Sequence, residues 1–202
     1  QKIKEALEAG KTARSVELNE DESELIKDAF LLTIKPTLYI ANVSEEQLAD
    51  VENDKYINEV KELAAKENAE VIPLCIKIEE ELASLDNEDD KKEMLEMLGL
   101  QESGLDKVIK SSYDLLGLMS FLTAGEPEVR AWTIKKGTKA PQAAGKIHSD
   151  IERGFIRAEV VSYDDLMREG SMNAVKEKGL LRSEGKDYIM QDGDIVLFRF
   201  NV

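Results

Sequence analysis

The spacing of apolar residues along this 202-residue chain changes near Gly117. Before that position, apolar residues recur every three or four positions in several segments, as on the buried face of an amphipathic helix. Two short, continuous apolar runs interrupt this pattern and are typical of strands buried on both faces. The pattern predicts helices over residues 24–30, 86–98 and 105–116, a further helix capped by Asp54, and strands over residues 38–41 and 71–76.

The strand–helix–strand order before residue 77 predicts a βαβ unit of a parallel sheet, with the two later helices covering it. After Gly117 the apolar residues alternate with polar ones, as in half-buried strands. The alternating pattern predicts strands over residues 129–134, 156–161 and 195–200, helices over residues 140–153 and 171–178, and a turn at residues 192–194. This second part is therefore expected to be a small mixed sheet around a helix, of class α+β.

Charge divides the chain at the same place. Residues 1–117 contain 14 Lys and Arg residues against 29 Asp and Glu residues, whereas residues 118–202 contain 13 of each. An acidic surface repels phosphates, so contact with nucleic acid is expected from the second part. We therefore expect a domain boundary near Gly117.

Several kinds of site are not expected. The single cysteine, Cys75, excludes an internal disulfide framework, and the single histidine, His148, cannot build a zinc site without suitable partners. Acidic clusters at residues 20–22, 79–81 and 88–90 lack the pattern of a calcium loop and suit helix starts, where the helix dipole favours negative charge. The chain has no apolar run of about 18 residues and no signal-peptide pattern. We expect no metal site, no membrane partner and a cytoplasmic location.

Residues 123–155, which begin Thr-Ala-Gly-Glu-Pro-Glu-Val-Arg, closely resemble the C-terminal TGS domain of the YchF-type Obg-like ATPases. The resemblance continues through residues 156–202 and includes Asn-Val-Ser-Glu at residues 42–45, so it covers essentially the whole chain. It implies a fold of class α/β plus α+β in three segments. These are the end of a helical, coiled-coil insertion at residues 1–22, the C-terminal part of a P-loop NTPase (G) domain with a Rossmann-like parallel sheet at residues 23–117, and a TGS domain of β-grasp fold at residues 118–202.

The resemblance also implies a function. A complete family member is expected to bind and hydrolyse ATP, or GTP, with Mg²⁺, and to act near the ribosome, which the TGS domain would contact directly or through RNA. This chain has no phosphate-binding loop and no Mg²⁺ ligands, so it looks like the C-terminal half and is expected to be inactive alone, with no catalytic residue. A rival hypothesis is a stand-alone adaptor that binds protein or RNA through its β-grasp sheet without nucleotide.

Gly10-Lys11-Thr12 imitates the end of a phosphate-binding loop. That loop requires another glycine five positions before Gly10, because backbone amides must curl around the phosphates, and Glu5 occupies that position. A carboxylate has the wrong charge to face a triphosphate. We therefore interpret Gly10 as the terminator of a short helix.

Residues 42–45, Asn-Val-Ser-Glu, come directly after a predicted parallel strand, at the edge where α/β sheets bind ligands. Regulatory GTPases have Asn-Lys-x-Asp here, and the aspartate accepts hydrogens from N1 and the 2-amino group of guanine. With Val43 in place of Lys and Glu45 in place of Asp, the chain departs from that pattern and resembles the Asn-x-x-Glu signature of the YchF family, which binds ATP at least as readily as GTP. We predict that Asn42, Val43 and Glu45 contact a base. The alternative is that Glu45 is the first-turn acid of a helix capped by Ser44.

Cys75-Ile76-Lys77 stands at the carboxyl end of the second predicted strand. The resemblance places here the fifth nucleotide-binding element, which is Ser-Ala-Lys in regulatory GTPases and contacts the base. We expect Cys75 to be a small buried residue, because the sequence offers no neighbouring histidine to activate the thiol.

The second part of the chain also contains clustered basic residues. The resemblance implies a basic face on the β-grasp domain for phosphates of RNA or of a nucleotide effector, and the alternative is an ordinary solvated surface. The candidate residues are Lys136, Lys139, Lys146, His148, Arg153 and Arg157.

Overall fold

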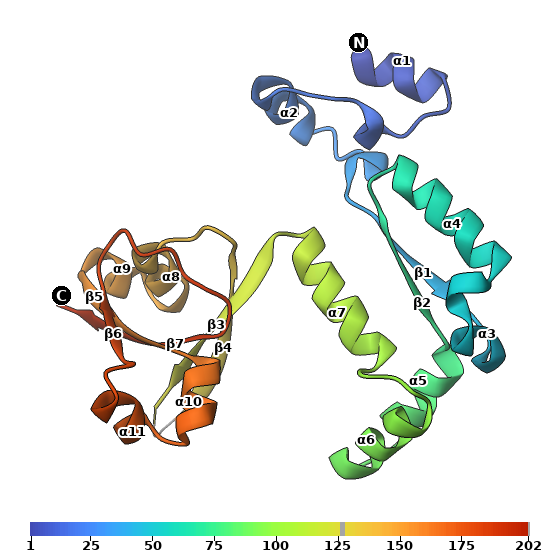
Figure 1. Ribbon diagram of the computed structural model, residues 1–202. Helices are drawn as coiled ribbons and strands as arrows, with labels where there is room; N and C mark the ends of the chain where they lie inside the picture. Colours follow the sequence, from blue (N-terminus) through green and yellow to red (C-terminus); the bar gives the residue numbers. More distant parts are fainter. Residues whose placement is uncertain (126–127, 202) are drawn as a thin grey trace. The chain divides into compact units, whose positions relative to one another are not determined.

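The computed structural model describes residues 1–125 and 128–201, so residues 126, 127 and 202 of the TGS-like segment lie outside the described part. The chain divides into two compact units, Gln1–Leu116 (unit 1) and Gly117–Val202 (unit 2). The apolar period and the charge both change at this division. Figure 1 labels the elements of both units.

Short helices form the first part of unit 1. They are α1 (Lys2–Glu8) and α2 (Glu20–Lys27), each followed by a 3₁₀ turn, η1 (Ala13–Ser15) or η2 (Leu32–Ile34). Asn19 caps α2, since its side chain accepts the N–H of Glu22 while the Glu22 carboxylate accepts the N–H of Asn19. This capping box makes α2 begin at Glu20, before the predicted residue 24. The helix ends at Lys27, ahead of Phe30, whose φ of 47° is not helical.

The sheet of unit 1 consists of two parallel strands, β1 (Leu38–Asn42) and β2 (Glu70–Leu74). Between them lie α3 (Glu45–Ala49), the turn η3 (Val51–Asn53) and α4 (Lys55–Lys66). Asp54 caps α4 by accepting the N–H groups of Tyr56 and Ile57 at 2.9 and 3.0 Å. The predicted βαβ unit and its helix cap are both confirmed.

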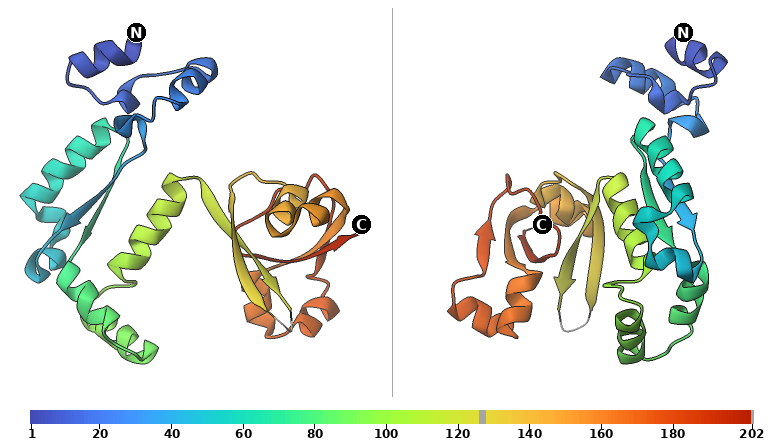
Figure 2. Two further views of the ribbon diagram at one scale, coloured as in Figure 1. Left: turned by 180° about the vertical axis from the view of Figure 1, so that it is seen from behind. Right: turned by 45° about the vertical axis from the view of Figure 1, so that its right-hand side comes forward.

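Helix α4 lies on one side of β1 and β2 and α7 (Gly104–Leu115) on the other (Figure 1 and Figure 2). Both helices pack more extensively against β2 than against β1. Ile72 and Leu74 of β2 are buried, whereas Ile40 of β1 is 51% exposed. The prediction that both strands are buried on both faces is therefore wrong for β1, because the helices cover that strand only in part.

Strand β2 ends earlier than predicted and leads into an additional helix. The strand stops at Leu74, and the chain turns at Cys75 into α5 (Ile76–Ala83). Ile78 and Leu82 share one face of α5 and are buried with Cys75, so the apolar run that predicted a longer strand belongs partly to this helix. Helices α6 (Glu88–Met97) and α7 follow close to their predicted positions.

Unit 2 is built on a mixed five-stranded sheet with the order β4-β3-β7-β5-β6. Only β3 and β7 are parallel neighbours among the described strands, and the other pairs are antiparallel. The strands are β3 (Leu118–Ala124), β4 (Val129–Lys135), β5 (Phe155–Ser162), β6 (Arg182–Glu184) and β7 (Asp194–Phe200). The sequence pattern predicted β4, β5 and β7 but missed β3 and the short β6.

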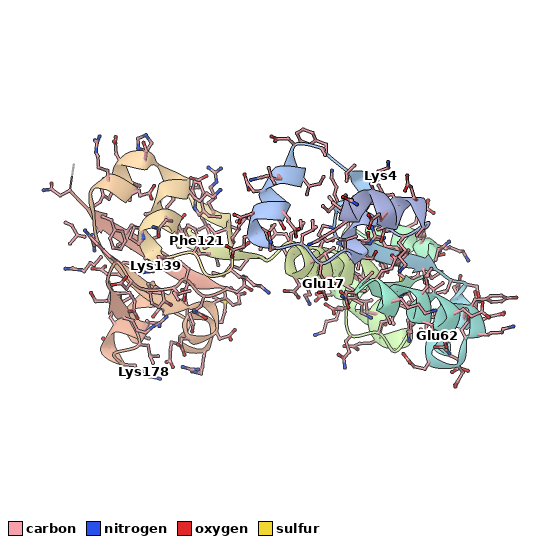
Figure 3. All side chains as sticks on the ribbon, turned by 90° about the horizontal axis from the view of Figure 1, so that it is seen from above. Lys4, Glu17, Glu62, Phe121, Lys139 and Lys178 are labelled. Atoms are coloured by element: carbon pink, nitrogen blue, oxygen red, sulfur yellow. The ribbon has the colours of Figure 1, made fainter. Side chains whose placement is uncertain are left out.

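Helices α8 (Ala140–Ile147) and α9 (Ser149–Arg153) lie against one face of this sheet (Figure 2). The main core lies between these two helices and the sheet. Phe121, labelled in Figure 3, lies in this core and is fully buried, and its ring centre is 5.9 Å from that of Phe198. A smaller cluster around Val161, Val175 and Ile195 is covered by α10 (Tyr163–Glu169) and α11 (Met172–Glu177). The sequence pattern did not predict α10.

The single helix predicted over residues 140–153 is in fact two helices. His148 separates α8 from α9 with extended backbone angles, φ −161° and ψ 141°. Its Nδ1 accepts the N–H of Asp150 at 3.2 Å and so caps α9. The apolar period continues across the break because Ile147 and Ile151 both pack against the same core.

Candidate functional site

The carboxyl ends of β1 and β2 both lead directly into helix starts. Asn42 is the last residue of β1 and lies opposite Leu74, the last residue of β2. The ladder gains one more bond where the Val43 N–H donates to the Leu74 carbonyl at 2.9 Å. Helix α3 then begins at Glu45 and α5 begins at Ile76. Two segments that are about thirty residues apart in the sequence therefore meet at one edge of the sheet.

Asn42 joins these two segments through its side chain. Its Oδ1 accepts the backbone N–H of Ile76 at 3.1 Å. That N–H belongs to the first turn of α5, where it has no partner within the helix. The bond fixes the start of α5 against β1, and it leaves the Nδ2 side of the amide as the hydrogen-bond donor.

Glu45 and Lys77 form a second link between the same segments. The Lys77 Nζ donates to Glu45 Oε1 at 2.7 Å, and the Glu81 carboxylate lies 3.9 Å away. The hydrogen bond that Lys77 donates to Glu45 is the main cause that raises the pKa of Lys77 above its ordinary value. The Lys77 and Glu45 side chains are 69% and 50% exposed, so this ion pair contributes little to stability.

A pocket of about 480 Å³ opens at this edge of the sheet. This volume lies within the usual range for small-molecule sites, roughly 300–1,000 Å³. Five of the six predicted base-site residues line the pocket. The lining residues are Asn42, Val43, Ser44, Glu45, Glu46, Cys75 and Lys77. Ile76 takes part through its N–H, and its side chain is 54% exposed.

The alternative prediction for residues 42–45, a helix capped by Ser44, is also met. Ser44 accepts the N–H of Gln47, and the Gln47 side chain accepts the N–H of Ser44. This capping box holds α3 in place and puts Glu45 in its first turn. The cap and a base site are compatible, since the Glu45 carboxylate still borders the pocket. Sequence reasoning did not assign Ser44 or Glu46 to the pocket, although both adjoin the Asn-x-x-Glu motif.

Cys75 is buried, at 4% exposed, and packs with Ile78 and Leu82. This confirms the expectation of a small buried residue. The end of α1 likewise agrees with the interpretation of Gly10-Lys11-Thr12. Gly10 has φ 72°, and the next N–H, that of Lys11, returns to the Ala6 carbonyl at 2.8 Å, as at a helix terminus.

The acidic clusters serve helix starts, one of them in an unforeseen way. Residues 20–22 and 88–90 lie in the first turns of α2 and α6, as predicted. Residues 79–81 lie within α5, and the carboxylate of Glu79 accepts the N–H groups of Gly104 and Leu105 at the start of α7. In the described part of the chain, no three His, Cys, Asp or Glu residues lie together as a metal site would need, and no helix is long and apolar enough to span a membrane.

The six basic candidates of unit 2 do not form one face. Lys146, His148 and Arg153 lie along α8 and α9, whereas Arg157 lies on β5 next to Ala158, a core residue that faces α8. Because side chains alternate along a strand, Arg157 points to the opposite face of the sheet. Lys136 follows β4 and Lys139, labelled in Figure 3, precedes α8.

Several of these basic side chains have acidic partners. Lys139 pairs with Asp187 at 2.7 Å, Arg153 with Asp150 at 2.9 Å, and Arg157 with Glu159 at 3.1 Å. All three pairs have an exposed basic partner, so the pairs are weak and can exchange for other anions. Lys146, His148 and Arg153 therefore lie near one another at the corner formed by α8 and α9, and phosphate binding by the basic residues stays a prediction.

The chain is similar to several curated proteins. The YchF-GTPase_C family, described as a protein of unknown function (DUF933), matches residues 118–201. A Bacillus subtilis protein named ribosome-binding ATPase YchF is 58% identical over 201 residues, and a Haemophilus influenzae protein of the same name is 51% identical over 202 residues. Each alignment covers 100% of this chain but only 55% and 54% of the relative. The chain thus spans about half the length of the curated relatives it matches.

The chain is also similar to solved structures. The Schizosaccharomyces pombe YchF GTPase superposes with a TM-score of 0.78 at 36% identity, covering 95% of this chain and 50% of that one. A GTP-binding protein from Pyrococcus horikoshii, at 20% identity and a TM-score of 0.57, shows the shared fold alone. The expected fold class, α/β plus α+β, is confirmed by these likenesses and by the two sheets. The chain belongs to the YchF family, and it matches the C-terminal half of the family's members.

Proposed function

We propose that the pocket at the ends of β1 and β2 binds the purine base of ATP or GTP. The observation that carries this proposal is the convergence of Asn42, Glu45 and Lys77 from two separate segments on one pocket. The amide of Asn42 supplies a donor to a base edge, and the carboxylate of Glu45 supplies an acceptor. The names of the relatives, ribosome-binding ATPase and GTPase, support a nucleotide as the ligand.

In this proposal the two units have different tasks. Residues 23–117 are the C-terminal part of a nucleotide-binding domain, preceded at residues 1–22 by the end of a helical insertion. Residues 118–202 are a TGS domain that contacts the ribosome, directly or through RNA, in the cytoplasm. Hydrolysis and Mg²⁺ binding belong to the complete protein, because phosphoryl transfer needs a phosphate-binding loop, and the Gly-x-x-x-x-Gly-Lys-Ser/Thr pattern of that loop does not occur in the 202 residues.

The base site is tested by Asn42→Ala in the full-length protein, where phosphate contacts anchor the nucleotide. Replacing Asn42 removes its hydrogen bonds to the base and also its bond to the Ile76 N–H. We expect ATP and GTP both to bind more weakly, by about 1–3 kcal/mol, as measured by calorimetry. Asn58→Ala is a matched control, because Asn58 lies on α4 and bonds to the Glu52 carbonyl outside the pocket. Unchanged affinity for both nucleotides in Asn42→Ala would favour the adaptor hypothesis.

A double variant, Val43→Lys with Glu45→Asp, recreates the Asn-Lys-x-Asp pattern of regulatory GTPases. We expect it to shift the preference towards GTP, by at most about a hundredfold if one or two hydrogen bonds are gained. Val43 is 6% exposed, so the folded fraction of this variant is checked first by circular dichroism. Equal discrimination by the parent and a folded double variant would argue against base contact at these positions.

A further inference from the structure

The Glu45–Lys77 ion pair crosses the pocket from one strand end to the other. Glu45 is the first residue of α3 and Lys77 is the second residue of α5. Lys77 is the single basic side chain among the described residues that line the pocket, where Glu45 and Glu46 are acidic. Because the bond to Lys77 uses Oε1 of Glu45, the lysine neutralises this carboxylate and restricts its position.

The state of the Glu45 carboxylate matters differently for the two purines. Guanine presents the hydrogens of N1 and the 2-amino group, which a free carboxylate accepts as charge-assisted hydrogen bonds. Adenine presents a lone pair at N1, which a free carboxylate repels. A carboxylate that is already bonded to an ammonium group is a poorer acceptor for guanine and a milder neighbour for adenine.

We propose that Lys77 is a specificity-determining residue, which positions and neutralises the Glu45 carboxylate so that the pocket discriminates less strongly in favour of guanine and accepts adenine. This inference rests on the proposed base site. It assigns to Lys77 a role through Glu45, in addition to any general attraction for the nucleotide phosphates. Removing the lysine therefore changes the ratio of GTP to ATP affinity, whereas a loss of general attraction weakens both nucleotides equally.

The test measures ATP and GTP dissociation constants of the full-length protein by calorimetry. In Lys77→Met the carboxylate of Glu45 is released, and the preference for GTP over ATP is expected to rise by about fivefold, because guanine no longer displaces this exposed ion pair to reach the carboxylate. Lys77→Arg keeps a positive charge that can pair with Glu45 and is expected to stay close to the parent. Lys91→Met is the matched control, since Lys91 pairs with Glu88 at 2.7 Å on α6, outside the pocket.

Repeating the Lys77→Met substitution in a Glu45→Gln protein distinguishes a role of Lys77 in positioning Glu45 from a merely structural role of Lys77. In Glu45→Gln the carboxylate is absent, so adding Lys77→Met is expected to leave the ratio of GTP to ATP affinity unchanged. The inference is overturned if Lys77→Met retains the parental ratio, or if it changes the ratio equally in the Glu45→Gln background. Asn42→Ala distinguishes the two levels of failure. If Asn42→Ala weakens the binding of both nucleotides while Lys77→Met keeps the affinity ratio, the base site is supported and only the role of Lys77 is contradicted. If neither variant has any effect on affinity, the base site is contradicted as well.

Discussion

The two sheets of this chain differ in how much of their apolar surface they bury. The five-stranded sheet of unit 2 packs a contiguous core that includes Phe121 and Ile134, which are 0% and 1% exposed. The two-stranded sheet of unit 1 leaves Ile40 51% exposed, and the buried cluster beside it is small. A strand gains burial from neighbours on its edges and faces, so similar apolar side chains stabilise these sheets to different degrees.

The segment of unit 1 that precedes β1 also leaves large apolar side chains exposed. Leu25, Phe30 and Leu32 are 85%, 83% and 78% exposed. In unit 1, the polar groups that shape the pocket lie at the carboxyl ends of β1 and β2. The largest buried core therefore lies in unit 2, whereas the proposed base site lies at the β1–β2 edge of unit 1.

The largest expected effect is on the core of unit 2. Phe121→Ala removes a fully buried ring that contacts both Trp132 and Phe198, and we expect it to destabilise unit 2 by about 3–5 kcal/mol. Ile40→Ala is expected to cost much less, because half of that side chain is already exposed. Chemical unfolding of the purified chain, followed by Trp132 fluorescence for unit 2 and by circular dichroism for the whole, measures both. Equal losses in the two variants would remove the contrast between the sheets.

Much of the fold was predictable because apolar period reports burial directly. The βαβ unit and β4, β5 and β7 follow from that pattern. Breaks within a continuous apolar pattern were not predictable, since Ile147 and Ile151 pack on one core although His148 interrupts the helix between them. The short strand β6 has only three residues, too few for alternation to be visible.

The residues of the candidate site that lie at strand ends were predictable from the sequence. Position at the end of a parallel strand, together with the family resemblance, identified Asn42 and Cys75, and both line the pocket. The pairing of Glu45 with Lys77 was not predictable, because it depends on where α5 begins, and the sequence pattern placed a strand there. The basic residues illustrate the same limit. Arg157 is close to Arg153 in the sequence, but strand alternation directs it to the other face of the sheet.

A smaller effect is expected where the start of unit 1 joins its sheet. Glu67 accepts from Arg14 at 2.6 Å and from the Tyr39 hydroxyl at 2.9 Å, and Arg14 also donates to the Thr33 carbonyl. The bond from Arg14, followed by that from Tyr39, lowers the pKa of Glu67 below its ordinary value of 4.5. The Arg14 and Glu67 side chains are 17% and 20% exposed, so Glu67→Gln is expected to destabilise unit 1 at neutral pH, by less than Phe121→Ala destabilises unit 2.

The pH dependence of that loss has a definite sign. A carboxylate with a lowered pKa stabilises the folded state above its unfolded pKa, and the contribution is lost as pH falls through the folded pKa. The difference between parent and Glu67→Gln is therefore expected to shrink as the pH falls below about 4.5. Urea unfolding of both proteins over this range measures it. A difference that stays constant with pH would show that Glu67 acts by packing alone.

In unit 2, the hydrogen bond from Tyr188 to the buried Asp194 is expected to make a smaller contribution to stability, which is lost at high pH. The Tyr188 hydroxyl donates to Asp194 at 2.8 Å and accepts from Arg182 at 3.0 Å. Burial, followed by the bond to Asp194, raises the pKa of Tyr188 to about 12. Tyr188→Phe is expected to cost about 1 kcal/mol at neutral pH, the net worth of one hydrogen bond.

A raised tyrosine pKa stabilises the folded state fully below the unfolded pKa, and that contribution is lost as pH rises through the folded one. The cost of Tyr188→Phe is therefore expected to fall between pH 10 and about 12. Unfolding measurements over this range test the stability, and the ultraviolet absorbance of tyrosinate follows the titration itself. If all tyrosines titrated together near pH 10, the bond between Tyr188 and Asp194 would not be present in solution.

The smallest effect on stability, and a direct test of the separate tasks of the two units, concerns the α8–α9 corner. Lys146→Glu with Arg153→Glu reverses two exposed charges, so folding is expected to be unchanged. If this corner contacts ribosomal phosphates, each lost contact lowers the slope of log affinity against log salt by about one unit. Lys27→Glu with Lys35→Glu makes the same change in charge at exposed positions of unit 1. Co-sedimentation of the full-length protein with ribosomes at several salt concentrations compares them: weaker binding in the first pair alone assigns the contact to unit 2, whereas equal weakening in both pairs reduces it to net charge.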